Sequence, residues 1–179
     1  MKKSLITHSS ILILLVLFAA CTTKQREYRS NDGSVVATCQ YSGNDSTNAV
    51  WQFKDANGNP LVPHYDSLRI VERGPEGHPQ TVCFHIGKEQ RWMQFYTTMQ
   101  LRSDGKVVDG QREGLWTFYY PDGTKQCEAT FLAGLEEGPY RVYRENGVPY
   151  YIGQYQNGNR IGTWEVYGPD GSLAGKQEY

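Results

Sequence analysis

The chain has 179 residues and a formal net charge of −1, with 18 lysines and arginines against 19 acidic side chains. Its 13 Tyr, 6 Phe and 4 Trp make up 13% of the residues. This aromatic content excludes a disordered chain, because disordered chains lack the apolar surface that offsets the conformational entropy lost on folding. The near-zero charge excludes the basic footprint of a nucleic-acid-binding protein. We therefore expect one folded domain and no nucleic-acid partner.

The first 20 residues have the pattern of a secretory signal peptide. Two lysines near the start precede an apolar run at 11–18, and two alanines follow it. The run is too short to span a bilayer, which needs about 20 apolar residues, so we expect cleavage after it. Leu17–Cys21 resembles a bacterial lipobox, and the resemblance implies that Cys21 carries lipid. An ordinary signal peptide with a coincidental cysteine is the alternative.

The lipobox resemblance also implies a location. Because Thr22, rather than Asp, follows Cys21, we expect a lipid-anchored protein of the outer membrane that faces the periplasm. The lipid would be the membrane contact, since the remaining chain is mildly acidic and gains little from anionic lipids. Residues 21–34 are then predicted to be the lipidated cysteine and a flexible tether.

Residues 35–109 predict β-structure without a clear repeat. Strands are expected at 35–41, 68–71 and 81–86, where apolar and polar residues alternate, with a loop at 43–48. Two stretches, 51–58 and 87–96, have a Trp at the place it takes in the repeat described next, and we interpret them as degenerate units. Asp-Gly pairs at 104–105 and 109–110 predict turns.

A 24-residue repeat fills residues 110–179. Glycines and aromatic residues recur at this spacing in three units, at Gly114, Trp116 and Gly123; Gly138, Tyr140 and Gly147; and Gly162, Trp164 and Gly171. Each unit contains a β-favouring run such as 114–120, an Asp-Gly or Asn-Gly turn, a second strand such as 127–131 and a polar return such as 157–162. Since one hairpin is marginally stable, the hairpins should stack. The predicted fold is all-β, an open antiparallel sheet of stacked hairpins with an irregular β N-terminal half.

This pattern, Gly-x-Trp-x-x-Tyr-x-x-Asp-Gly, resembles the MORN repeat. It is most similar to the bacterial MORN-variant proteins, some of which carry an antitoxin-like label. The first unit matches at Gly114, Trp116, Tyr119, Asp122 and Gly123, and the other units match 24 and 48 residues later, with Tyr140 replacing Trp and Asn146 replacing Asp in the second. The resemblance implies an elongated sheet of MORN-type hairpins without a catalytic site.

The residues offer little for catalysis or metal binding. His64, His78 and His85 are not at metal-ligand spacings, and motifs for zinc proteases, hydrolases and phosphate loops are absent from the sequence. We expect no cofactor, no metal and no catalytic residue. The remaining cysteines could form one disulfide in an oxidising compartment or stay as buried thiols: Cys39, Cys83 and Cys127.

We predict a lipid-anchored envelope scaffold that presents its sheet to an unidentified protein or envelope polymer. The candidate binding surface is an aromatic row with two neighbouring arginines: Tyr119, Tyr143, Tyr167, Arg141 and Arg144. Internal packing of that row is the alternative. The C-terminal edge strand would permit a homodimer. Two other functions stay open: an antitoxin- or immunity-like protein that neutralises a toxin, as the family label implies, and an envelope hydrolase with paired carboxylates.

Overall fold

The computed structural model describes residues 23–42 and 49–179. The predicted signal peptide at 1–20, the lipidation site Cys21 and the predicted loop at 43–48 lie outside these ranges. The described chain contains no helix that could cross a membrane. Its elements are β1 (Thr23–Arg29), β2 (Val35–Ser42), β3 (Val50–Asp55), β4 (Ser67–Arg73), β5 (Pro79–Ile86), β6 (Glu89–Phe95), β7 (Leu101–Val108), β8 (Gln111–Tyr119), β9 (Lys125–Leu132), β10 (Leu135–Tyr143), β11 (Pro149–Gln156), β12 (Asn159–Tyr167) and β13 (Leu173–Glu178).

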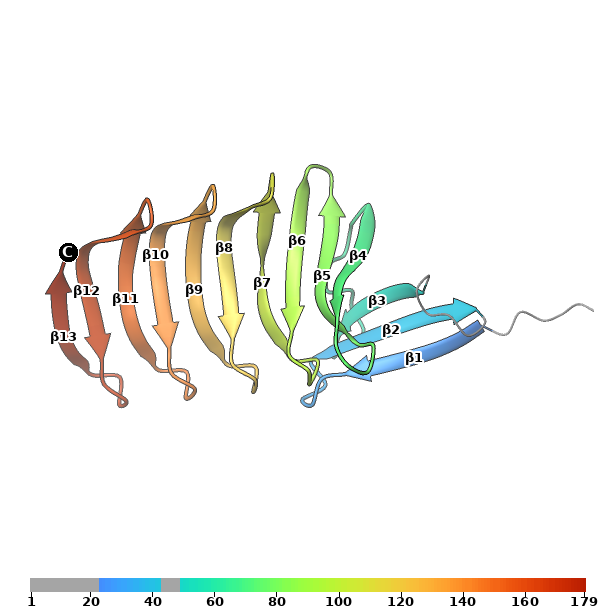
Figure 1. The fold of residues 1–179 in the computed structure, drawn as a ribbon. Coiled ribbons are helices and arrows are strands. Elements are labelled where there is room, and N and C mark those ends of the chain that lie inside the picture. The colour runs from blue at the N-terminus through green and yellow to red at the C-terminus, as the bar shows by residue number, and fades with distance from the viewer. Residues whose placement is uncertain (1–22, 43–48) are drawn as a thin grey trace, which may run out of the picture.

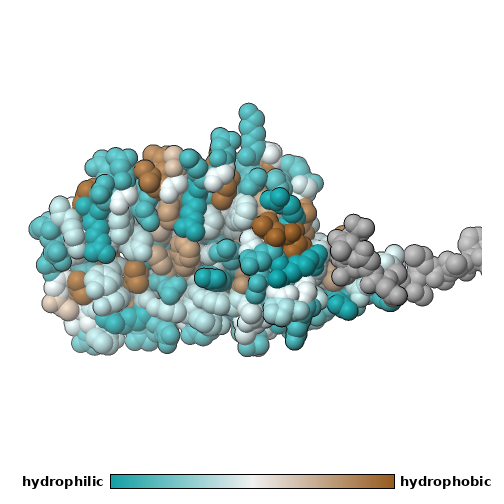
Figure 2. All heavy atoms as spheres, viewed as in Figure 1, coloured by the Kyte–Doolittle hydropathy of each residue, from teal (hydrophilic) through white to brown (hydrophobic). Residues whose placement is uncertain are grey.

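The strands form two antiparallel sheets (Figure 1). β1, β2 and β3 make a small sheet, and β4–β13 make a ten-stranded sheet in which each strand pairs with its neighbours in the sequence. The large sheet is open, with β4 and β13 at its two edges. Hydrophilic residues cover most of the side shown in Figure 2, and apolar residues form separate patches. The prediction of an all-β fold made of consecutive hairpins in an open sheet is confirmed.

Two kinds of turn alternate along the large sheet, at opposite ends of the strands (Figure 1). Longer turns hold the third glycine of each unit at φ between +78° and +89°: Gly123, Gly147 and Gly171. Two-residue turns have positive φ at both positions, as a type I′ hairpin turn requires: Asp109–Gly110, Ala133–Gly134 and Asn157–Gly158. The polar return predicted at 157–162 is therefore wrong in extent, because β12 already begins at Asn159.

The first glycine of each unit bends the strand that contains it. Gly114, Gly138 and Gly162 have φ between +61° and +93° inside β8, β10 and β12. The pairing register shifts beside each of them, so that the glycine strand has two more residues than its partner. Such bulges bend a strand and increase its twist, and the strands of the large sheet bow along their length in Figure 1. Glycine adopts the required φ without the strain that a Cβ would add.

Large rings and small residues alternate across one face of the large sheet, which we call the ring face. The rings lie on every second strand, 24 residues apart: Trp92, Trp116, Tyr140 and Trp164. The strands between them carry Gly105, Ala129 and Gly153, which the register places opposite the rings. The side chains of Trp116 and Trp164 are only 4% and 2% exposed. Arginines complete the cover, with Arg112 and Arg160 each stacked 4.6 Å above the ring of a tryptophan.

The predicted turn at Asp104–Gly105 is wrong. Both residues lie inside β7, between Leu101 and Val108. Gly105 is small because of packing: a Cβ atom there would lie 2.2 Å from Cδ2 of Trp116, and Gly153 has the same relation to Trp164. An Asp-Gly pair thus marks either a turn or a site of close ring packing, and only the 24-residue spacing of Gly105, Ala129 and Gly153 separates the two.

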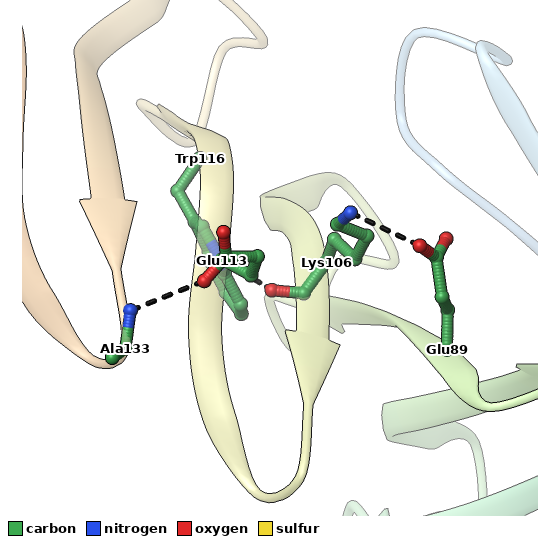
Figure 3. Close-up of polar contacts among 5 residues, drawn as sticks. All are labelled: Glu89, Lys106, Glu113, Trp116 and Ala133. Atoms are coloured by element: carbon green, nitrogen blue, oxygen red, sulfur yellow. Dashed lines mark hydrogen bonds and ion pairs between the residues drawn. The ribbon is translucent and has the colours of Figure 1, made fainter.

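Hydrogen bonds between consecutive units recur with the same period. Tyr96, Tyr120 and Arg144 donate to the backbone oxygens of the next unit at 2.8–2.9 Å: those of Tyr119, Tyr143 and Tyr167. At the other end of the strands, the carboxylate of Glu113 accepts from the turn amide of Ala133 at 3.1 Å (Figure 3), and Glu137 accepts from Asn157 at 2.7 Å. These bonds fix the offset between neighbouring hairpins, and the carboxylates are part of the fold.

The N-terminal half is more regular than the sequence predicts. Residues 23–29, expected within a flexible tether, form β1 and pair with β2 from Thr23↔Ser42 to Arg29↔Val36. β4–β7 belong to the same sheet as the three predicted repeats, and Trp92 lies in β6 at the position of Trp116 in β8. The β1 strand escapes sequence analysis because its side chains are almost all exposed, so polar and apolar residues do not alternate in it.

The small sheet packs on the face of the large sheet opposite to the ring face. Phe53 of β3 lies against Phe84 of β5 and Phe95 of β6, with ring centroids 5.9 and 5.8 Å apart. The buried cluster around them comes from both sheets, and includes Val35, Ala37, Cys39, Trp51, Val82 and Met93. Among the described residues the cysteines are free thiols, with Cys39 and Cys83 buried and Cys127 half-buried.

Candidate functional site

Three of the predicted binding residues share one face of the large sheet. Tyr119, Tyr143 and Tyr167 end β8, β10 and β12, and each follows a ring-face residue, so it points to the opposite side. We call this side the tyrosine face. Phe95 has the corresponding place in β6, where the small sheet covers it. The tyrosine face is therefore covered over β5 and β6, and over the later strands it exposes residues such as Arg141.

The three tyrosine hydroxyls are held in place rather than projecting freely. Tyr143 donates to Oε2 of Glu128 at 2.9 Å, and Tyr167 donates to Oε2 of Glu165 at 2.6 Å. Burial raises the pKa of Tyr119 and of Tyr143, and the bond to Glu165 raises the pKa of Tyr167. The hydroxyls thus remain protonated donors near neutral pH, and the rings are half-buried. This row orients the acidic side chains of the face.

Ion pairs cross the strands of the tyrosine face. Four cations have an acidic partner: Arg91 with Asp104, Lys106 with Glu89 (Figure 3), Lys125 with Glu128, and Lys176 with Glu165. The pair of Arg91 is bidentate, with Nε 2.8 Å from Oδ1 of Asp104 and Nη2 2.5 Å from Oδ2. The hydrogen bond from Lys125 holds the pKa of Glu128 below its usual value. Most charge on this face is therefore already compensated.

Two grooves lie on the tyrosine face. The first, of about 320 Å³, is lined by residues of β5–β8 that include the paired Arg91 and Lys106. The second, of about 500 Å³, crosses β10–β13, and we call it the β10–β12 groove. It is lined by Pro139, Arg141, Ile152, Gly153, Gln154, Ile161, Gly162, Thr163, Glu165 and Lys176. A groove of this size fits a few side chains of a partner.

The structure separates the two predicted arginines. Arg141 lines the β10–β12 groove and is exposed. Arg144 instead stacks its guanidinium 3.9 Å above the ring of Tyr150 and donates to the backbone oxygen of Tyr167. Arg144 therefore acts between repeat units, and the three tyrosines border the charged row without lining the groove. The groove residues Ile152 and Ile161 escaped the sequence analysis, although both alternate in phase with the row of Arg141.

The described residues contain no cluster of three or more His, Cys, Asp or Glu side chains that could hold a metal ion. The two carboxylates nearest the tyrosine row, those of Glu128 and Glu165, each have a lysine and a tyrosine as partners. Their lone pairs are used in ion pairs and hydrogen bonds. The arrangement favours recognition of another molecule by charge and shape.

Taken together, the fold and this surface define a β-repeat protein built from stacked hairpins with one open, grooved face. Residues 112–133 and 136–157 match the MORN repeat variant family. These segments correspond to β8–β9 and β10–β11, so the chain contains MORN-type repeats, which in general are binding modules without enzymatic activity. None of the curated proteins compared with the chain matches it significantly.

Proposed function

We propose that the protein is a lipid-anchored scaffold of the cell envelope that binds a partner protein on the open part of the tyrosine face. The lipid on Cys21 would hold the sheet at the outer membrane, facing the periplasm. The MORN-type repeats support a binding or scaffold role. The lipobox resemblance of Leu17–Cys21 supports the anchor, and the pairing of β1 with β2 brings the folded part of the chain close to that cysteine.

One observation carries the choice of surface. The tyrosine face already binds protein within the chain, because β1–β3 pack on it over β5 and β6 through Phe53, Phe84 and Phe95. The same face continues over β8–β13, where it carries two grooves and the exposed Arg141. The ring face, in contrast, buries its own rings under Arg112 and Arg160. A partner is therefore expected on the tyrosine face.

Site-specific photo-cross-linking in the cell of origin tests this choice. A benzophenone amino acid replaces Gln154, an exposed residue of the β10–β12 groove, and the matched control replaces Gln177, an exposed residue of β13 that lies opposite Trp164 on the ring face. We expect a discrete protein adduct from position 154 and none from position 177. Equal adducts from both positions, no adduct from position 154, or an adduct that is polysaccharide rather than protein would overturn the proposal.

A further inference from the structure

Arg141 is unusual among the cations of the tyrosine face. Arg91, Lys106, Lys125 and Lys176 are all within ion-pair distance of a carboxylate. Within residues 23–42 and 49–179, Arg141 makes neither an ion pair nor a hydrogen bond through its side chain, although its charge helps to lower the pKa of Glu128. Its five N–H donors are thus free in the groove, and they match a carboxylate in a bidentate geometry.

The walls of the β10–β12 groove define what could accompany that carboxylate. Pro139, Ile152 and Ile161 supply apolar surface around Arg141, and Gln154 and Thr163 add neutral polar groups. Removing such apolar side chains from water on binding contributes about 25 cal/mol per Å². A ligand that fits therefore has an acidic group with apolar groups on either side.

We infer that the β10–β12 groove receives an acidic side chain of the partner protein, flanked by apolar residues, with its carboxylate bound by Arg141. The inference rests on the proposed function, since it names what that partner presents. A protein segment fits better than a sugar chain. Sugars stack on exposed aromatic faces, and the rings of Tyr143 and Tyr167 are half-buried and lie outside the groove lining.

The test uses the acetylated and amidated tripeptide Leu-Glu-Leu as a probe, titrated into the isotope-labelled protein and followed by NMR. We expect shifts at the amides of 152–154 and 161–163 and at the side chain of Arg141. Arg141→Gln should weaken binding about tenfold, because hydrogen bonds to charged groups are the stronger ones, and Arg141→Lys should fall between. Lys88→Gln removes the same charge at an exposed turn between β5 and β6 and should leave binding unchanged.

Further arms of the titration decide the ligand class. The tripeptide Leu-Gln-Leu should bind at least several-fold more weakly, and glucuronate and inorganic phosphate should not reproduce its pattern of shifts. Equal binding of Leu-Gln-Leu, equal binding to Arg141→Gln, a stronger response to glucuronate or phosphate, or no shift with millimolar Leu-Glu-Leu would each overturn the inference. If the cross-link at position 154 still forms in any of these cases, the proposed function stands and only the acidic-segment inference fails.

Discussion

Replacing Gly105 by alanine tests the packing rule of the ring face most directly. The added Cβ would lie 2.2 Å from Cδ2 and 2.3 Å from Cε2 of Trp116. The indole has little room to retreat, because it is 4% exposed, lies near Phe118 and Phe131, and donates from Nε1 to the backbone oxygen of Lys106 at 2.9 Å. Relieving the clash therefore requires the ring to move by about 1 Å, which a close-packed site resists.

The magnitude follows from two losses. Overpacking of a filled site costs about 1–3 kcal/mol, and a weakened indole hydrogen bond costs about 1 kcal/mol more. We expect Gly105→Ala to lower the free energy of unfolding by about 2–4 kcal/mol, measured by urea denaturation with circular dichroism. Gly175→Ala is the matched control: Gly175 is in β13, has no heavy atom within 4 Å of an added Cβ and lacks a positive φ. It should leave the stability unchanged or raise it slightly.

A second substitution separates the ring clash from a general effect of alanine. Tyr140 follows Ala129 by the same eleven positions that separate Trp116 from Gly105, so the protein already tolerates alanine beside the smaller ring. Trp116→Tyr in the Gly105→Ala background should therefore recover part of the lost stability. A Gly105→Ala protein within about 0.5 kcal/mol of the wild type, the range of ordinary surface substitutions, would refute the packing rule.

Three other predictions concern a turn, an ion pair and the anchor. Ala133→Asn should raise the free energy of unfolding by about 0.5–1 kcal/mol in the same assay, because Ala133 has φ +49°, which Asn tolerates better. Glu128→Gln should be less stable at neutral pH and should lose less stability on acidification, because the lowered pKa of Glu128 beside Lys125 stabilises the fold above the unfolded-state pKa and stops doing so as the pH falls through the folded value. Cys21→Ser should abolish incorporation of radiolabelled fatty acid and move the protein out of the membrane fraction.

The period of the sequence predicted the fold wherever side chains repeat their role. Trp116, Tyr140 and Trp164 are 24 residues apart because each fills the same space between two strands with small residues, so composition and position agree. The period weakens where the cover changes. Phe95 has the place of Tyr119 but lies under the small sheet, and the shorter stretch from Gly87 to Trp92 blurs the register. β1 carried no signal, because an exposed edge strand places few constraints on its side chains.

The surface was predicted in part for the same reason. Alternation within a strand correctly separated Tyr119 from Trp116 and Phe118, which fixes the face on which the tyrosine row lies. Alternation could not predict that Arg144 stacks on Tyr150, because Arg144 lies in a turn where the strand period ends. Nor could it predict that Arg141 lacks an acidic partner, since this depends on which lysine reaches each carboxylate across neighbouring strands.

The two faces of the sheet meet different physical demands. On the ring face each ring is buried by its own neighbours, so the face needs no further layer and offers mainly the edges of Arg112 and Arg160 to solvent. The tyrosine face changes chemistry along its length: Phe95 lies where the small sheet ends its cover, and Tyr119 repeats the position with a hydroxyl added. One backbone position thus serves as core or as surface according to what lies above it. A partner docking over β10–β13 would extend the cover that β1–β3 begin, using a face whose ability to bind protein the fold already requires.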